Sequence, residues 1–490
     1  MASPGSESSG WTHGLTAYLV YLILVTTTGP LQFGFHLAEL NAPEDVITCR
    51  KSSISSEDTS TLPQCISMTP VQFGLVQAIF TLGGLIGALS AGPASTKYGR
   101  LLTMRLTTVF FVIGPAFEAL APSIPVLSFG RFISGLGAGA AIVVVPVYVA
   151  GISPPEKRGL FGASTQVMIN LGILITQVLG YFLSHGPYWR IILGVAGAIG
   201  VTQFVGLLGA AESPQWSADH GNVQGAKQTL QRIRGPDENI DAETEGWGHS
   251  GSEEEEALLH DDPNQPQHQP TKPSHNASVG VFQVLRDPLY RPAIIAVVSV
   301  MVAQQFCGIN SIVMYGVALL SDLLGAASAL LAVFVSLVNL LTTILCAPLS
   351  DRYGRKTCLL LSIGGMGANS LLLALSIIFS VPALSIVATV LFVASFAVGL
   401  GPVPFILASE LVGQEAVGAT QSWALAANWI ATFVVAQFFP VLNDWMGKGR
   451  IFFLFTALAC AFGAFVAWWV PESRGKRDAD EVWGRERRVD

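Results

Sequence analysis

Long apolar runs, separated by short polar segments, occupy most of the 490-residue chain. Each run is long enough to cross the hydrocarbon core of a bilayer, which takes about 20 residues of helix. The pattern predicts a tail over residues 1–14, an N-terminal bundle over 15–210, a central loop over 211–289, a C-terminal bundle over 290–470 and a second tail over 471–490. The predicted spans are 15–37, 72–92, 101–121, 126–150, 161–184, 190–210, 290–320, 327–349, 357–379, 383–409, 417–440 and 450–470.

Short motifs recur at nearly constant spacing, which indicates a duplicated six-helix unit. The segment 93–100 (PASTKYGR) is repeated as 348–355 (PLSDRYGR), and Glu-Ser follows both the sixth and the twelfth span, at Glu212 and Glu472. Because six is an even number, the two units cross the membrane in the same orientation. In such parallel repeats the substrate binds midway between the halves. We therefore expect an all-α membrane protein with twelve transmembrane helices in two six-helix bundles.

Composition agrees with a polytopic membrane protein, since 51% of the residues are hydrophobic and only 12% are charged, against about 25% in soluble domains. The net charge of −7 comes largely from the central loop and indicates no nucleic-acid partner. Basic residues concentrate after even-numbered spans, which predicts that both termini and the central loop are cytosolic. Cys49 and Cys65 lie in the loop after the first span; they would pair in an oxidising compartment or remain free thiols.

The seventh span carries amides at Gln304, Gln305 and Asn310. We interpret this stretch as one continuous helix with the three amides on one broad side. Amides that faced lipid would be costly, so they should face other helices or a cavity. A neutral, hydroxyl-rich ligand would suit them, but amides also tie membrane helices together without any ligand.

Ionisable residues within the spans suggest a second kind of chemistry. His36 and Glu39 are three residues apart and share a helix face, and an ionisable pair at membrane depth suggests proton handling. Alternatively, the helix has already reached the interface there and both groups are wet. Arg131, in the fourth span, requires a carboxylate, for which Glu39 and Glu118 are the candidates.

The spacing of reactive residues does not indicate an enzyme: we find no metal-ligand cluster, nucleophile elbow or phosphate loop, and expect no catalytic residue, metal or cofactor. The two glycines and two prolines between Gly399 and Phe405 predict a broken tenth helix.

The central loop contains Glu254-x-x-x-Leu258-Leu259, which resembles an acidic dileucine sorting signal. A sorting adaptor is therefore a candidate partner, and the membrane would be vacuolar or endosomal, or else the plasma membrane. The sequon at Asn276 should stay unmodified on the cytosolic side.

The Gln-Gln-x-x-Gly-Ile-Asn string and the two Tyr-Gly-Arg turns resemble the sugar porter family of the major facilitator superfamily, and the facilitative glucose transporters in particular. The segment 34–43, together with the dileucine loop, looks most like a fungal branch associated with the vacuole. The resemblance implies the major facilitator fold and sugar-binding roles for Gln166, Gln304, Gln305, Asn310, Asn339, Phe405 and Asn428, with Phe405 at a position where many members carry tryptophan. It further implies a cytosolic gate at Gly99, Arg100, Arg158, Asp351, Arg355 and Glu410. The proton-coupling candidates, His36, Glu39 and Arg131, follow from their own chemistry and not from the resemblance.

Several positions depart from the family pattern. His36 stands where proton-coupled members carry aspartate, and Ala397 replaces a glutamate found beside the sugar in glucose transporters. Gly151 and Val417 replace gate residues of opposite charge. The hypothesis is that one salt bridge between the halves is absent, which leaves Glu410 to pair with Arg158 and Asp351 with Arg355.

The sequence therefore predicts a transporter that moves a hexose-like monosaccharide by alternating access, either passively or coupled to protons. The alternative is a transporter-like sugar sensor or vacuolar sorting factor. The identity of the sugar stays open.

Overall fold

The computed structural model describes residues 16–50, 62–154, 157–236, 238–244, 247, 281–346, 348–413, 416–476 and 479–485. These residues form helices and connecting turns, with no strand among them. Within these described ranges, twelve helical segments are long and apolar enough to cross a membrane, which confirms the predicted all-α fold. The N-terminal half contains α1 (Ala17–Ala38), α3 (Pro70–Tyr98), α4 (Arg100–Ala119), α5 (Ile124–Ile152), α6 (Arg158–Leu183) and α7 (Trp189–Leu208).

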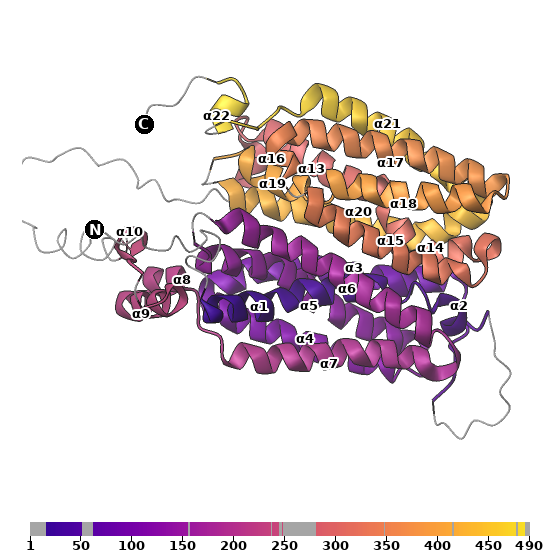
Figure 1. Cartoon of the computed structure of the whole chain (residues 1–490), viewed down its shortest axis with the longest axis horizontal. Coiled ribbons are helices and arrows are strands. Elements are labelled where there is room, and N and C mark those ends of the chain that lie inside the picture. The colour runs from indigo at the N-terminus through magenta and orange to yellow at the C-terminus, as the bar shows by residue number, and fades with distance from the viewer. Residues whose placement is uncertain are drawn as a thin grey trace, which may run out of the picture.

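The C-terminal half repeats this order with two of its spans divided. It contains α13 (Arg291–Phe306) with α14 (Ile309–Leu324), α15 (Ala327–Cys346), α17 (Arg355–Ile378), α18 (Pro382–Val398) with α19 (Val403–Glu410), α20 (Val417–Met446) and α21 (Ile451–Trp469). The two halves lie side by side (Figure 1), with α3 packed along α20 and α6 along α15. We call the interface between the two halves the seam. Substrate sites of this architecture lie along it.

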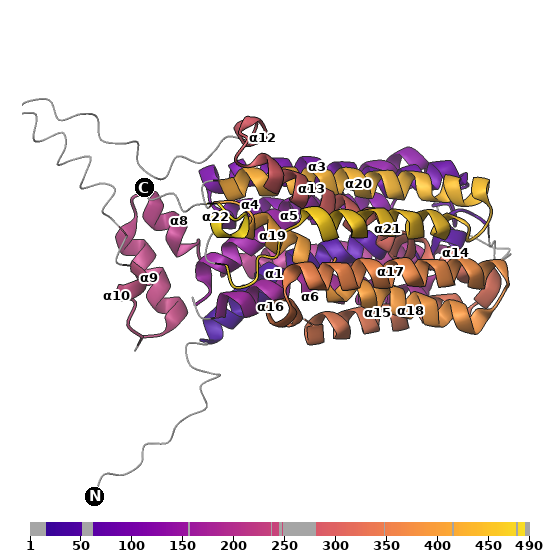
Figure 2. The same cartoon turned by 90° about the horizontal axis from the view of Figure 1, so that it is seen from above.

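Short helices mark the two ends of the bundle. At one end, the terminal face, lie α8 (Pro214–Asp219), α9 (Val223–Arg234), α10 (Asp241–Thr244), α12 (Gln283–Arg286), α16 (Leu349–Tyr353) and α22 (Ala479–Val482). Figure 2 shows these helices from above, again toward one end of the bundle. At the other end, the disulfide face, lie α2 (Glu44–Ile47) and the disulfide bond between Cys49 and Cys65. The structure thus pairs the two cysteines whose state the sequence left open.

Glycine divides the seventh span, where we expected a continuous helix. Gly308 has a left-handed φ of +97° and separates α13 from α14, so Gln304 and Gln305 end one helix while Asn310 begins the next. A side chain at Gly308 would collide with the ring of Phe455, and a residue with a Cβ atom would also resist this φ. The prediction of one helix was therefore wrong. The predicted break in the tenth span is confirmed between α18 and α19.

The repeated motifs meet in space, once in each half. Gly99 (φ +96°) and Gly354 (φ +98°) each turn the chain directly before a helix. The carboxylate of Glu212 accepts hydrogen bonds from the backbone of Arg100 and Leu101, at 3.0 Å each. In the other half, Glu472 accepts from the backbone of Arg355 at 2.8 Å and of Lys356 at 3.1 Å. Glu212 therefore caps the positive N-terminal end of α4, and Glu472 caps that of α17.

Candidate substrate and coupling site

Four amides of the C-terminal half form one hydrogen-bonded chain. Asn310 donates from Nδ2 to Gln305 Oε1 at 2.6 Å, and Gln305 donates from Nε2 to Gln304 Oε1 at 3.1 Å. Asn428 of α20 donates to the same Gln304 oxygen at 2.6 Å. Gln304, Gln305 and Asn310 are only 4–6% exposed. The structure thus brings together four of the seven residues that the sequence predicted to bind sugar.

The broken helices explain why these amides converge. Gln304 donates from Nε2 to the carbonyl of Leu400 at 2.5 Å and to that of Gly401 at 3.3 Å. These carbonyls lie in the break between α18 and α19, where they are not acceptors of regular helical hydrogen bonds. Exposed backbone of this kind is tolerated at membrane depth where it lines a buried polar site. Two helix breaks therefore supply one polar patch, which we call the amide cluster: Gln304, Gln305, Asn310 and Asn428.

A second group of amides bridges the halves between α6 and α15. Gln166 donates to Asn170 Oδ1 at 3.3 Å, and Asn339 of the other half donates to the same oxygen at 3.2 Å. Asn170 in turn donates from Nδ2 to Thr343 Oγ1 at 2.8 Å. The sequence assigned sugar binding to Gln166 and Asn339 but not to Asn170, which joins them. Its signal was present: Asn170 stands four residues after Gln166, on the same helix face.

The aromatic side chains of Trp429 and Phe405 differ in their surroundings. Trp429 is 2% exposed and packs edge-on against Phe33 and Phe80 of the N-terminal half, with ring centroids 5.6 and 6.2 Å apart. Its ring touches the backbone position of Gly84, where any side chain would collide with it. Phe405, by contrast, lies on α19 beyond the helix break and is 41% exposed. It belongs to neither amide group.

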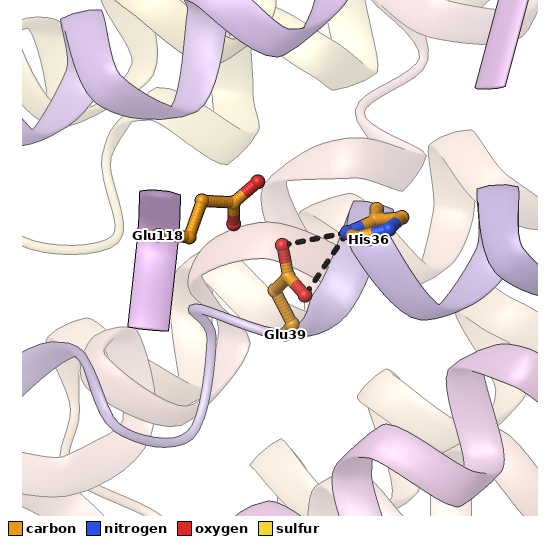
Figure 3. Close-up of side chains that lie close together, drawn as sticks. All are labelled: His36, Glu39 and Glu118. Carbon is orange, nitrogen blue, oxygen red and sulfur yellow. Dashed lines mark hydrogen bonds and ion pairs between the residues drawn. The ribbon is translucent and has the colours of Figure 1, made fainter. Parts of the chain in front are cut away.

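The N-terminal half holds a buried ionic cluster, formed by His36, Glu39, Glu118 and Arg131. All four side chains are at most 1% exposed. Arg131 donates from Nη1 to Glu39 Oε1 at 2.5 Å, and His36 Nδ1 lies 3.0 and 3.1 Å from the two oxygens of Glu39. Figure 3 shows Glu39 between His36 and Glu118. The alternative that His36 and Glu39 are wet was therefore wrong.

Glu118 joins this cluster from α4. Its Oε1 accepts a hydrogen bond from Ser134 at 2.5 Å, while its Oε2 has no partner among the described residues. The carboxyl group lies within 4.8 Å of the ligand atoms of His36 and Glu39. The sequence offered Glu118 only as an alternative partner for Arg131. The structure gives Arg131 to Glu39 and leaves Glu118 as a second carboxyl beside the ion pair.

The ionic cluster is connected to the other half. Gln77 accepts from Arg131 Nη2 at 3.2 Å and donates to the carbonyl of Met314, on α14, at 3.3 Å. Asn41, two residues after Glu39, accepts from the backbone of Val317 at 3.1 Å. These hydrogen bonds connect the charge state of the ionic cluster to the contact between the two halves near the disulfide face.

A small cavity of about 30 Å³ lies between the halves beside these links. Its polar lining includes Asn41 and Gln177 from the N-terminal half and Asn339, Ser336 and Thr389 from the C-terminal half. A space of this size holds about one water molecule. The seam is therefore nearly closed at this depth.

The chain matches the family model described as "Sugar (and other) transporter" over residues 22–481. It belongs to this family. It is 34% identical to a probable metabolite transport protein of Saccharomyces cerevisiae, with 96% of each chain covered. It is 31% identical to vacuolar protein sorting-associated protein 73 of the same yeast, over 94% of this chain and 95% of that one.

Animal relatives and a bacterial structure agree with this sugar transporter family. The chain is 29% identical to the human facilitated glucose transporter member 3, over 96% of this chain and 92% of that one. The inward-open, partially occluded structure of the xylose transporter XylE from E. coli has a TM-score of 0.74 and 22% identity, with 94% of this chain and 100% of that one covered. The structural likeness shows that the fold is that of a major facilitator protein.

The positions that the resemblance assigned to a cytosolic gate lie near the terminal face. Arg355 donates to Glu410 at 2.8 Å, and Ser473 donates to the other oxygen of Glu410 at 2.6 Å. These bonds join Arg355 to Glu410 within one half. They do not test the expected pairs of Glu410 with Arg158 and of Arg355 with Asp351, which stay predictions. The side chains of Arg158 and Asp351 lie outside the described residues.

The motif of the central loop cannot be placed in the structure. Glu254, Leu258 and Leu259 fall outside the described residues, as does Asn276.

Proposed function

We propose that the protein carries a hexose-like monosaccharide across a bilayer by alternating access, with the amide cluster as its main recognition surface. The observation that carries this proposal is the unbroken chain of four amides, each of which offers both a donor and an acceptor to sugar hydroxyls. The family membership and the facilitated glucose transporters among the relatives support a sugar as the substrate. A wrong epimer would leave a buried amide unpaired, and this is a source of selectivity.

The contacts between the halves support alternating access. The hydrogen bonds seen between described residues of the two halves lie at mid-depth, where Asn170 meets Thr343, or toward the disulfide face. At that face Gln437 of α20 also donates to the carbonyl of Val71 at 3.4 Å. This pattern corresponds to a conformation closed at the disulfide face. Rocking of the halves about the amide-lined seam would break these bonds and open that face.

For orientation, we propose that the terminal face is cytosolic, because the short basic loops follow even-numbered spans. The membrane is proposed to be vacuolar or endosomal, a location supported by the dileucine string and by a relative named for vacuolar protein sorting. An epitope tag at the chain's C-terminus should then react with antibody only after permeabilisation, and tagged protein should follow vacuolar markers. Protein at the cell surface would contradict the location.

Transport is tested with purified protein in sealed liposomes and radiolabelled D-glucose, mannose, galactose and fructose. We expect saturable uptake of at least one hexose. A matched variant for the recognition surface is Gln305→Leu, which removes a central amide and should abolish uptake. Absence of flux for every sugar, together with retained sugar binding, would instead favour the sensor alternative.

We further propose that transport is coupled to a proton carried by the ionic cluster. Two carboxyls there face a single guanidinium, and an uncompensated buried charge is strongly unfavourable. The cluster is neutral with Glu39 ionised against Arg131 and with one proton held by either Glu118 or His36. Loss of that proton leaves a net negative charge beside Gln77, the residue that connects the cluster to α14.

An imposed pH gradient tests the coupling. Wild-type protein should accumulate the transported hexose above equilibrium, because proton flow drives sugar flow. Glu118→Gln, which mimics the protonated acid and cannot release a proton, should equilibrate the sugar without accumulating it. Uptake by the wild type that merely equilibrates would show passive transport and contradict the proposal.

A further inference from the structure

A polar cavity of about 370 Å³ opens at the disulfide face, separate from the ionic cluster. The N-terminal half contributes α2 and the residues next to it, and the C-terminal half contributes the ends of α14 and α20. The charged and titratable groups of its lining are Glu44, Asp45, Arg50, Tyr315, Asp322, Asp444 and Lys448. The cavity therefore lies on the seam that must open when substrate passes this face.

Glu44 is the one carboxyl of this lining that is buried, with 5% of the residue exposed. Its Oε1 accepts a hydrogen bond from Arg50 at 3.3 Å, but the Arg50 side chain is 41% exposed, so water weakens the attraction. Its Oε2 is buried and has no partner among the described residues. Asp322 is engaged by Lys448, which leaves that lysine occupied. The charge of Glu44 is thus poorly compensated.

Other acids make this charge more unfavourable. The pKa of Glu44 is raised to about 8, mainly by burial; Arg50 opposes the rise, and the carboxylates of Asp45 and Asp444 add to it. Asp444 is the informative neighbour, because it belongs to α20 in the other half. Two acids therefore face each other across the seam. Tyr315, whose hydroxyl donates to the carbonyl of Ala436 at 2.5 Å, forms part of the wall between them.

We propose that this cavity is a proton-binding site that controls the disulfide face: with a proton on Glu44 the two halves close there, and without it they separate. A proton fits this cavity better than a metal ion does. Among the described residues, the carboxylates of its lining do not come close enough together to share a metal ion. The exchange is a simple one, in which a carboxylate oxygen of Glu44 takes up a proton from water on this face and returns it there. No other group changes its bonds.

The direction of the effect follows from linkage. In the open state Glu44 meets water and titrates near its ordinary pKa of 4.5, whereas in the closed state its pKa is about 8. The closed state therefore binds the proton more tightly. Its stability relative to the open state falls as the pH rises from about 4.5 to about 8, and is constant outside that window. An acidic compartment on this side would hold the face shut.

The test measures the separation of the halves directly. Spin labels are placed at Leu120→Cys and Phe379→Cys, two exposed positions at the disulfide-face ends of α4 and α17. Cys346 and Cys460, which are partly exposed, are first replaced by serine. Electron–electron distances are then recorded for the full chain in lipid nanodiscs from about pH 5 to about pH 9, a range that spans the expected titration.

In the wild type we expect the long-distance population to grow as the pH rises. Glu44→Gln, which mimics the protonated acid, should keep the short distance at every pH. Asp444→Asn removes the facing charge, so its transition should move to higher pH, because the closed state then tolerates ionised Glu44 better. The double variant Asp322→Asn with Lys448→Gln is the matched control: it removes a complete ion pair from the lining of the same cavity, frees no cation beside Glu44, and should respond like the wild type.

A wild-type distance that ignores pH would overturn the proposal, as would a Glu44→Gln variant that responds like the wild type. The proton-binding site depends on the proposed function in one respect: both require that the disulfide face opens and closes. The distance measurement needs no sugar, so a protein that fails to transport hexose could still show the switch. Conversely, hexose flux with a pH-insensitive distance would refute the switch alone.

Discussion

The two halves share one fold and one repeated turn before α4 and α17, but among the described residues of the spans only the N-terminal half buries charged side chains. The N-terminal half buries charge in the ionic cluster, around Glu39 and Arg131, and the C-terminal half buries neutral groups in the amide cluster, around Gln304. Charged groups respond to protons, whereas amides offer hydrogen bonds to a ligand without changing charge. Duplication has thus produced two bundles of the same shape with different proposed tasks.

At the terminal face the extra charge lies in the other half. We call the two turns there, around Gly99 and around Gly354, the corners. In the C-terminal half, Glu410 is held by Arg355 and Ser473. At the corresponding corner of the N-terminal half stands Gly151, and a Cβ atom there would lie 2.9 Å from Ser213 Oγ. Arg100 Nε is buried there with no partner among the described residues. The C-terminal corner therefore holds a carboxylate between its serine and its arginine. The N-terminal corner has the serine and the arginine but no carboxylate between them.

The largest effect should come from removing the positive charge of the ionic cluster. Arg131→Leu leaves Glu39 buried without its ion-pair partner, which should lower the free energy of unfolding by about 3–5 kcal/mol. The midpoint of thermal unfolding in detergent measures the loss. The variant should also abolish proton-driven accumulation.

A double variant, Arg131→Leu with Glu39→Leu, serves as the control because it removes both charges. It should recover most of the lost stability, since apolar residues tolerate this site better than a lone charge. Equal destabilisation by the single and double variants would mean that packing, rather than charge, decides the stability of this half.

A smaller effect is expected for the amide cluster. Gln304→Leu removes the amide that bonds Gln305, Asn428 and the carbonyl of Leu400. Hexose flux should fall about ten- to hundredfold, because a buried polar group left unpaired costs about 1–3 kcal/mol. The measurement is initial uptake into liposomes, normalised to the reconstituted protein.

Asn369→Leu is the matched control for this loss. Asn369 is a buried amide of the same half, 8% exposed, but among the described residues its side chain bonds only the carbonyl of Gly365 in its own helix. Its replacement should leave flux nearly unchanged. If both variants lost flux alike, the amides would be structural, and the ligand-binding interpretation would fail.

The smallest effect concerns the corner that lacks a carboxylate. Gly151→Glu should place one between Ser213 and Arg100, as Glu410 stands between Ser473 and Arg355. A partly exposed pair of this kind contributes about 0.5–1 kcal/mol at most, so thermal unfolding should shift upward by only a few degrees.

Gly151→Gln, of the same size but without charge, separates the ionic effect from the loss of the glycine. Equal shifts for the two variants would contradict the comparison of the corners. The broader hypothesis, that Gly151→Glu together with Val417→Arg shifts the population of inward- and outward-open states, stays a prediction. Distances between labels on the two halves would measure that population.

The sequence predicted the residues of the amide cluster but not their arrangement. Gln304, Gln305 and Asn310 were placed on one continuous helix because an apolar run of this length is typical of a single span. The left-handed Gly308 breaks that helix, and the amides meet across the break rather than along a face. Spacing along a helix could not reveal this, since glycine is also common in unbroken membrane helices.

The ionic cluster shows the opposite case. The residues His36, Glu39 and Arg131 were predicted together, and the alternative of a wet interface was excluded only by their burial. Glu118 was one of two candidates for Arg131, and no local pattern could decide between them. The choice depends on how α4 and α5 pack, which is a long-range property.

What the sequence determined by itself were the apolar runs, the duplication and the residue types at the seam. These follow from local chemistry: twenty apolar residues demand a span, and a repeated string shows a repeated unit. The tertiary structure alone decided which polar groups meet: Glu212 with the start of α4, Gln77 with Met314, and Glu44 across from Asp444. Such pairings depend on the packing of helices far apart in the chain, and a buried charge acquires its properties only from the neighbours that the packing brings to it.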